Sequence, residues 1–264
     1  MTSKETACIT GATSGIGLAF AHALAARGHD LLLAGRDAGR LAHLANELEG
    51  HGRDVKWLAG NLAEEAGQNA LCAAITATPG LSLLINNAGV GEVVPLEQTA
   101  IDDIRTMIAV NVSAVAALSL AALPAIKGNK GQIINVASGV AFAAMAGAAV
   151  YGGTKAFVAQ FSRTLALEVE PFGCTVQTLV PGLTRTNLGG AEATGFFNQF
   201  PDEWVMSPED LVQASLVAMD RQETICAPGV QDEQQIIAMI DAMQSLGMGV
   251  SSREPAARYT RKMP

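Results

Sequence analysis

The fold of this chain is decided by the stretch Thr6-Ala7-Cys8-Ile9-Thr10-Gly11-Ala12-Thr13-Ser14-Gly15-Ile16-Gly17. Thr6–Thr10 is a short apolar run typical of a buried strand, and a helical pattern begins at Ile16. Between them glycine recurs as G-x-x-x-G-x-G, which permits a tight turn and a close backbone approach to a diphosphate. The helix start adds partial positive charge there. The stretch therefore predicts a dinucleotide site formed by Gly11, Thr13, Ser14, Gly15, Ile16 and Gly17.

Short apolar runs and longer helical patterns alternate along the rest of the chain. The further strand-like runs are Asp30–Ala34, Val55–Ala59, Leu81–Asn86, Gln132–Ala137, Thr175–Leu179 and Glu223–Ala227. The helical patterns lie near Ile16–Arg27, Ala38–His51, Glu64–Ala77, Ala100–Leu123, Tyr151–Glu170, Pro208–Arg221 and Gln231–Leu246. Strand–helix repetition produces a parallel sheet, and strands without polar alternation are buried on both faces. We therefore expect an α/β Rossmann fold with a doubly wound, seven-stranded parallel sheet and helices on both faces.

The composition of the 264 residues suits one globular domain. Apolar residues make up 49% and aromatic residues 5%, which fits helices packed closely on a sheet. The net charge of −8 argues against a general nucleic-acid-binding protein. Cys8, Cys72, Cys174 and Cys226 form no C-x-x-C pair and are typical of reduced core cysteines. We predict a single domain over residues 1–264, located in the cytoplasm.

Two segments raise the question of a leader sequence or a membrane span. Met1–Glu5 leads directly into the first strand without the apolar stretch of a signal peptide. Met107–Ile126 is 20 residues long without a charge, about the length of a membrane span. Because it contains Asn111, Ser113 and Pro124, we interpret it as a helix buried between the sheet and a neighbouring subunit. The expectation is a homodimer or homotetramer that binds neither membrane nor nucleic acid.

The residues after the second strand predict which dinucleotide binds. Sites selective for NAD(H) place an acidic residue there, on the ribose 2′-hydroxyl. This chain has Gly35, which leaves room, and Arg36, whose planar guanidinium suits a 2′-phosphate. Asp37 comes one position later and is typical of a helix N-cap. We predict NADP(H) as the preferred cofactor, and NAD(H) as the alternative, since an arginine stacked on adenine would discriminate weakly.

Tyr151 and Lys155 are the candidate acid/base pair. Residues four apart share one face of a helix, so the phenol and the ammonium point the same way. A free phenol titrates near ~10, and a nearby cation lowers its pKa towards neutrality. Pairs with this spacing also occur by chance on helix surfaces, so the interpretation depends on the other motifs.

With these motifs, the chain resembles the short-chain dehydrogenase/reductase family over nearly its whole length. Six features carry the resemblance: Thr10–Gly17 (TGxxxGxG), Asn86-Asn87-Ala88-Gly89 (NNAG), Asn111, Ser138 at 13 residues before Tyr151, Tyr151 with Lys155 (YxxxK), and Pro181-Gly182 with Thr186 (PGxxxT). Each motif is short, but six in this order are specific to the family.

The resemblance implies a role for each of these residues. Tyr151 would exchange a proton with the substrate oxygen, while Lys155 would lower the tyrosine pKa and bind the nicotinamide ribose. Ser138 would hold the substrate oxygen and stabilise charge developing there. Asn111 would anchor a water that links Lys155 to solvent. Further contacts to the cofactor are implied for Asn61, Leu62, Asn87, Ala88, Gly89, Pro181, Gly182, Thr184 and Thr186.

Purely structural roles are the alternatives for several of these residues. Ser138 would then cap a turn, Asn111 would satisfy backbone groups within a helix, and Asn86 and Asn87 would stabilise a strand-end turn. Two features also depart from the family pattern. Asn61 replaces the usual aspartate beside adenine, and Gly152-Gly153 lowers the stability of the helix at the catalytic pair. The two glycines indicate either a close backbone approach or a mobile site.

Apolar residues near the catalytic set indicate an apolar substrate. The long segment 187–205 is predicted to form a substrate lid, with Phe196 and Phe197 against the substrate. The alternative is that these aromatic residues pack in a core or an interface. Val140–Ala149 adds further apolar side chains. The polar tail 247–264 is either disordered or covers a partner subunit.

Rival chemistry finds little support in the sequence. All four histidines lie in the first fifth of the chain, away from Ser138, and no His/Cys cluster has zinc spacing, so we predict no metal site. The prediction is an NADP(H)-dependent oxidoreductase that interconverts a carbonyl and a secondary alcohol by hydride transfer. The alternatives are an NAD(H)-dependent alcohol dehydrogenase on the same site, an epimerase or dehydratase, and a non-catalytic protein that binds a nicotinamide cofactor.

Overall fold

A computed structural model describes residues 5–50, 52–186 and 200–259 of the chain. The chain divides into two compact units, Met1–Pro228 and Gly229–Pro264. In the described residues, every strand belongs to the first unit. The second unit contains the helix α9 (Gln234–Gly249) and the 3₁₀ turn η7 (Ala257–Tyr259).

The first unit is built on a seven-stranded parallel sheet with the order β3-β2-β1-β4-β5-β6-β7. Its strands are β1 (Thr6–Thr10), β2 (Asp30–Gly35), β3 (Val55–Ala59), β4 (Leu81–Asn86), β5 (Gln132–Val136), β6 (Thr175–Leu179) and β7 (Ile225–Cys226). The predicted fold class is confirmed, and six strands end within one residue of their predicted bounds. The edge strand β7 is shorter than predicted, because it pairs only with Thr178 and Leu179.

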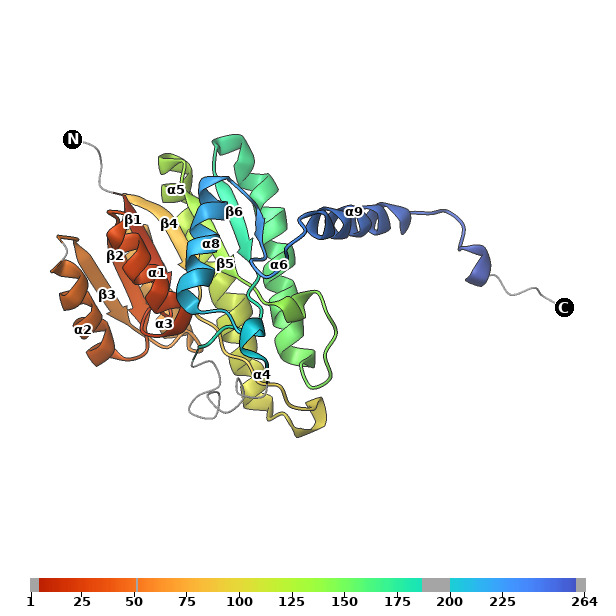
Figure 1. Cartoon of the computed structure of the whole chain (residues 1–264), viewed down its shortest axis with the longest axis horizontal. Coiled ribbons are helices and arrows are strands. Elements are labelled where there is room, and N and C mark those ends of the chain that lie inside the picture. The colour runs from red at the N-terminus through yellow and green to blue at the C-terminus, as the bar shows by residue number, and fades with distance from the viewer. Residues whose placement is uncertain (1–4, 51, 187–199, 260–264) are drawn as a thin grey trace. The chain divides into compact units, whose positions relative to one another are not determined.

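Helices cover both faces of the sheet, as predicted (Figure 1). One face is covered by α1 (Gly15–Ala26), α2 (Ala38–Glu49) and α8 (Pro208–Asp220), and the other by α3 (Glu65–Thr76), α5 (Val115–Asn129) and α6 (Ala149–Val169). Alternate strand residues enter the two resulting cores: Ala7 and Ile9 of β1 pack on one side, and Cys8 packs on the other. Both faces are therefore buried, which explains the uninterrupted apolar runs of the sequence.

The long helical pattern at Ala100–Leu123 is not one regular helix. It consists of α4 (Ile101–Ile108), a π-helical turn η2 (Ala109–Ala114) and α5, which continues to Asn129. By length and apolar composition the run Ile101–Asn129 would suffice to cross a membrane. However, its Leu118, Ala122 and Ile126 are fully buried against the sheet. It is therefore a core helix of the first unit.

The predicted substrate lid lies largely outside the described residues, which exclude 187–199 and with them Phe196 and Phe197. The described end of this segment includes the 3₁₀ turn η6 (Asp202–Trp204). In the second unit, the helix expected at Gln231–Leu246 is α9, so residues 247–249 of the expected tail are helical. No side chain of α9 is buried.

Candidate active site

One edge of the sheet collects the predicted motifs. In a parallel sheet the carboxyl ends of all strands lie at the same edge, and open α/β sheets bind ligands where the strand order reverses. Here the order reverses between β1 and β4. Gly11–Gly17 follows β1, Asn87–Gly89 follows β4, Ser138 follows β5, and Pro181-Gly182 follows β6. The topology thus brings four motifs that are far apart in sequence to a single crevice.

The glycines of the first turn are required by its geometry. Gly11 and Gly15 have positive φ angles of 66° and 52°, which residues with a side chain rarely adopt. A Cβ on Gly17 would lie 2.2 Å from the Gly11 carbonyl oxygen. Within the described residues, the Ser14 side chain makes no capping hydrogen bond at the start of α1. The first-turn N–H groups of this helix are therefore available to an anion.

Thr10 and Asn87 connect the phosphate turn to the end of β4. The Thr10 hydroxyl accepts hydrogen bonds from the backbone N–H groups of Asn87 and Ala88, each at 2.9 Å. In return, Asn87 Nδ2 donates to the Thr10 carbonyl oxygen at 2.9 Å. Asn87 therefore stabilises the turn at the end of β4, which was the structural alternative for this residue. It also fixes the loop that carries Gly89.

Residues expected at the adenine end of a dinucleotide follow β2 and β3. Arg36 is exposed after β2 and has no ion pair within the described part of the chain. Asp37 caps α2 by accepting a hydrogen bond from the Arg40 N–H at 3.0 Å, as predicted. Asn61 Oδ1 accepts from the Ala63 N–H at 3.1 Å, and Asn61 Nδ2 donates to the carboxylate of Glu64. The Asn61 amide is thus engaged in ordering the turn after β3, beside Leu62.

The loop after β5 and the first turns of α6 carry a serine, a tyrosine and a buried lysine. The Ser138 hydroxyl lies beside the Tyr151 hydroxyl. Lys155 follows one helical turn after Tyr151, is only 5% exposed, and donates from Nζ to the Val136 carbonyl oxygen at 2.8 Å. Its Nζ lies 5.9 Å from the centre of the Tyr151 ring. The structure therefore brings three of the four predicted catalytic residues together.

Burial shifts the pKa values of Lys155 and Tyr151. Removal from water lowers the pKa of Lys155 from 10.5 to about 8. Burial also raises the pKa of Tyr151, while the neighbouring Ser138 hydroxyl acts in the opposite direction. The resemblance assigns the lowering of the tyrosine pKa to Lys155. That assignment stays a prediction: Lys155 Nζ bonds the Val136 carbonyl oxygen and lies 5.9 Å from the centre of the Tyr151 ring.

Asn111, the fourth predicted catalytic residue, lies in the π-helical turn and is 1% exposed. Its Oδ1 accepts from the Val90 N–H at 3.0 Å, and its Nδ2 donates to the Val90 carbonyl oxygen at 2.7 Å. The second Nδ2 proton is directed to Thr154 Oγ1 at 3.0 Å. Both donors of the amide are therefore used within the protein. Asn111 satisfies backbone groups of the loop after β4, whereas the structural alternative had placed those groups within a helix.

The loop after β4 approaches all of these side chains. A Cβ on Gly89 would lie 3.3 Å from Lys155 Nζ and 3.4 Å from Asn111 Oδ1. A Cβ on Gly91 would lie 2.6 Å from Cε2 of Tyr151. Gly91 was not among the residues predicted from the sequence. The only signal for it is that a second glycine follows the NNAG motif after one residue.

The segment after β6 returns towards the phosphate turn. The Pro181 carbonyl oxygen accepts from the Gly139 N–H at 3.0 Å, beside Ser138. Thr184 pairs with Met206 in an isolated parallel bridge. A Cβ on Gly15 would lie 3.0 Å from Thr186 Cγ2. Of the residues implied by the PGxxxT motif, Thr186 thus contacts the predicted diphosphate turn, whereas Gly182 is exposed and has open space around its Cα.

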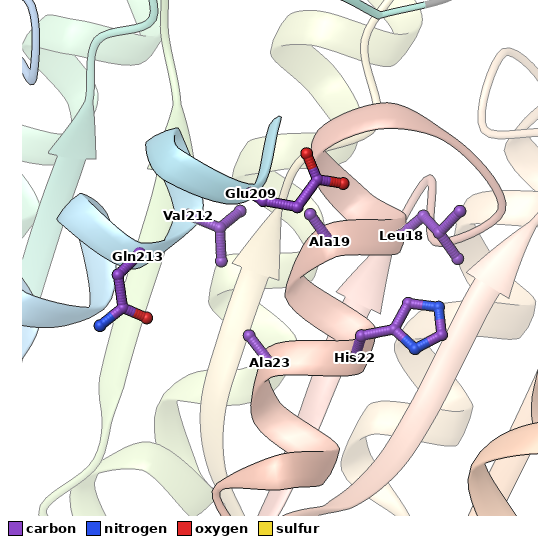
Figure 2. A pocket seen from close by; sticks show the side chains of 7 residues that line it. All are labelled: Leu18, Ala19, His22, Ala23, Glu209, Val212 and Gln213. Carbon is purple, nitrogen blue, oxygen red and sulfur yellow. The ribbon is translucent and has the colours of Figure 1, made fainter. Parts of the chain in front are cut away.

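A separate groove lies away from these motifs. It has a volume of about 450 Å³ and is lined by Leu18, Ala19, His22 and Ala23 of α1 and by Glu209, Val212 and Gln213 of α8. Figure 2 shows Ala19 and Ala23 facing α8, with polar side chains at the rim. None of the candidate catalytic residues lines it. Within the described residues, no group of three or more His, Cys, Asp or Glu side chains could hold a metal ion.

Comparison with known proteins gives consistent matches. The profile of the family described as short chain dehydrogenase matches residues 5–195. A "probable NADP-dependent dehydrogenase" of Haemophilus influenzae is 32% identical over 261 residues, covering 94% of this chain and 98% of the relative.

Two solved structures resemble the chain closely. A short-chain dehydrogenase from Sphingobium yanoikuyae in complex with NADPH has a TM-score of 0.90 at 35% identity, covering 97% of this chain and 100% of the other. A bulky-bulky ketone specific alcohol dehydrogenase from Comamonas testosteroni has a TM-score of 0.88 at 31% identity, covering 98% and 100%.

Proposed function

The chain belongs to the short chain dehydrogenase family, and from this premise we propose that it is an NADP(H)-dependent oxidoreductase that interconverts a ketone and a secondary alcohol. The predicted family and enzyme class are confirmed. The observation that carries the proposal is the Tyr151 hydroxyl beside that of Ser138, with the buried Lys155 one turn away. A proton donor, an oxygen-binding hydroxyl and a cation in this arrangement are suited to proton transfer at a carbonyl oxygen.

The proposed mechanism assigns one task to each residue. In reduction, the Tyr151 hydroxyl donates its proton to the substrate oxygen, and in oxidation the tyrosinate removes the alcohol proton. Ser138 donates a hydrogen bond to the same oxygen and stabilises charge that develops there. When bound, a nicotinamide cofactor would supply or accept the hydride. Lys155 would contribute positive charge beside the tyrosinate and would bind the nicotinamide ribose.

Reprotonation of Tyr151 requires a path to solvent. Lys155, with its pKa near 8, exchanges protons readily at neutral pH and is the natural first member of that path. Because both donors of the Asn111 amide are occupied, a water in this path would accept no hydrogen bond from that side chain. We therefore assign the Asn111 side chain to holding the loop after β4. The proposed anchor for the water is an acceptor oxygen of the π-helical turn.

The proposed cofactor preference rests on Arg36. Its exposed guanidinium follows β2, where the ribose 2′-position of a dinucleotide lies in this fold, and no described acid neutralises it. The Haemophilus relative is named NADP-dependent, and the Sphingobium structure contains NADPH. Arg36→Ala should weaken NADPH binding about 10- to 100-fold and leave NADH binding nearly unchanged. Arg40→Ala, on the exposed start of α2, is the matched control.

The proposed substrates are ketones with bulky apolar substituents. The loops after β4 and β5 carry exposed apolar side chains, among them Val93, Leu96, Phe142 and Met145. These loops are joined by a hydrogen bond from the Val94 N–H to the Gly147 carbonyl oxygen at 2.9 Å. The Comamonas structure is titled as specific for bulky-bulky ketones. A panel that compares acetone-like with diaryl-like ketones would test this; a preference for the small ketones would contradict it.

We also propose a cytoplasmic homo-oligomer. Leu120 on α5 and Leu167 on α6 are each 70% exposed, and we place the interface on these helices. All four cysteines are unpaired, as expected in a reducing compartment.

The decisive experiment is Tyr151→Phe, assayed by absorbance of the reduced nicotinamide. Turnover should fall by at least about 10³-fold, because the proton donor is lost while the ring remains. NADPH affinity, measured by fluorescence titration, should stay within about twofold. Turnover at the wild-type rate would refute the mechanism. Wild-type protein that binds NADPH but reduces none of the panel would favour the non-catalytic alternative.

A further inference from the structure

We propose that Gly91 is a positioning residue, whose missing side chain sets the place of the Tyr151 ring against Ser138. The inference rests on the proposed catalytic role of Tyr151 for its effect on turnover. The contact itself rests on geometry alone.

The contact between Gly91 and Tyr151 is closer than any residue with a Cβ permits. A Cβ on Gly91 would lie 2.6 Å from Cε2, 2.7 Å from Cδ2 and 3.2 Å from Cγ of the Tyr151 ring. Distances below 3 Å lie inside van der Waals contact, so a side chain would force a displacement. The Gly91 backbone does not have a positive φ angle. The absence of a Cβ is therefore required by the tyrosine ring and not by the local backbone.

The ring cannot easily move aside. Its Cγ is one bond from Cβ, so a shift at that atom requires a rotation of the whole side chain or a movement of α6. Its hydroxyl lies beside Ser138 at the other end of the ring. A rotation that relieves the contact with Gly91 would therefore move the hydroxyl relative to Ser138.

The loop cannot easily move aside either, because it is held on both sides of Gly91. On one side, the Asn111 amide bonds both the N–H and the carbonyl oxygen of Val90, at 3.0 and 2.7 Å. On the other side, the Val94 N–H donates to the Gly147 carbonyl oxygen at 2.9 Å. Gly89, two residues earlier, faces Lys155 Nζ. The three residues 89–91 thus touch the lysine, the asparagine and the tyrosine of the proposed site in turn.

Gly91→Ala is the direct test, with Gly153→Ala as its matched control. Gly153 lies between Tyr151 and Lys155 on α6, and a Cβ there would meet nothing within 4 Å. In Gly91→Ala, kcat should fall roughly 10- to 100-fold, because displacements of the order of 1 Å carry such costs. NADPH affinity should stay within about twofold. In Gly153→Ala, kcat should be unchanged and Tm should rise by about 2–4 °C.

The pH profile separates positioning from a general loss of structure. If Tyr151 moves away from Ser138, it loses the neighbouring hydroxyl that lowers its pKa. The rising limb of the profile for alcohol oxidation, which requires the tyrosinate, should then move to higher pH. A lowered kcat with an unmoved profile, or with an equal loss of NADPH affinity, would overturn the proposal. An unchanged kcat would overturn it as well.

A stability cycle tests the contact without reference to turnover. Gly91→Ala should lower Tm by roughly 3–10 °C in the wild-type background, because it overpacks a held contact. In a Tyr151→Ala background, where the ring is gone, the same change should lower Tm by less than about 1 °C. If Gly91→Ala alone fails to fold, the double variant should fold. An equal Tm loss in both backgrounds, or a double variant that also fails to fold, overturns the proposal. This cycle stands even if Tyr151→Phe proves active, so the two proposals can fail separately.

Discussion

Replacement of Lys155 by methionine should make the protein more stable at neutral pH while abolishing its turnover. Burial lowers the pKa of this lysine from 10.5 to about 8. Each pKa unit corresponds to about 1.4 kcal/mol, so keeping the ammonium charged in the folded state costs about 3 kcal/mol at pH 7. Methionine fills a similar volume without charge. Against this gain stands the Val136 carbonyl oxygen, which loses its 2.8 Å hydrogen bond at a cost of about 1–3 kcal/mol.

The net expectation is a gain of about 1 kcal/mol in the free energy of unfolding, or about 2–4 °C in Tm. The gain should depend on pH in one direction. Below pH 8 the lysine is protonated in both the folded and the unfolded state, so wild type bears the full cost of burial. Between pH 8 and 10.5 the folded protein has released this proton while the unfolded chain still holds it. The stability of wild type therefore rises with pH in this window, and the advantage of Lys155→Met disappears.

The assay is urea unfolding, followed by circular dichroism at pH 7.0 and at pH 9.5. Lys56→Met, on the exposed edge strand β3, is the control and should show no pH-dependent difference from wild type. Two results would refute the reasoning. One is a Lys155→Met variant that is less stable than wild type at pH 7.0. The other is a stability difference that stays constant between the two pH values.

Three further predictions concern the glycine turn after β1, the exposed face of α5 and the buried cysteines. Gly17→Ala should lower NADPH affinity by at least about tenfold and destabilise the protein, because the new Cβ would overlap a backbone carbonyl oxygen. The control is Gly128→Ala, in open space on α5, which should change neither the NADPH affinity nor the stability when both variants are titrated and melted in parallel. Leu120→Glu should lower the molar mass measured by light scattering, and an unchanged mass would exclude α5 from the interface. Burial raises the pKa values of Cys8 and Cys226 to about 12. Both thiols should therefore resist a thiol reagent at pH 8 until the protein is unfolded. Fast labelling of the native protein would contradict their burial.

The strands could be predicted from the sequence because each is an uninterrupted apolar run between polar turns. Both of their faces are covered by helices, so burial leaves a signal at every position. The same signal fails at β7, where the predicted run Glu223–Ala227 contributes only Ile225 and Cys226 to the sheet. An edge strand is paired on one side only, and β7 pairs with only Thr178 and Leu179 of β6. The sequence of β7 itself does not indicate how many of its residues pair.

The helical pattern at Ala100–Leu123 concealed the π-helical turn. A change from i→i+4 to i→i+5 hydrogen bonding alters which residues share a face, but it requires no particular side chain. The charge-free stretch Met107–Ile126 runs through Ala109–Ala114 without a break, so the sequence pattern gives no warning. What fixes the turn is tertiary: the Asn111 amide reaches the Val90 backbone and Thr154. Asn111 could be identified from the family motif, but the groups that its side chain bonds could not.

The glycines around Tyr151 show the limit of local reasoning most clearly. Gly152-Gly153 had two interpretations, a close backbone approach or a mobile site. The structure supports the first at Gly152, where a Cβ would lie 3.3 Å from the Val140 carbonyl oxygen, and nothing in the structure explains a glycine at position 153. The strongest constraint falls instead on Gly91, which lies 60 residues before Tyr151 in the sequence and belongs to the loop after β4. Because the packing of β4 beside β5 brings that loop to the start of α6, a glycine that matters for the tyrosine cannot be identified from the residues next to it.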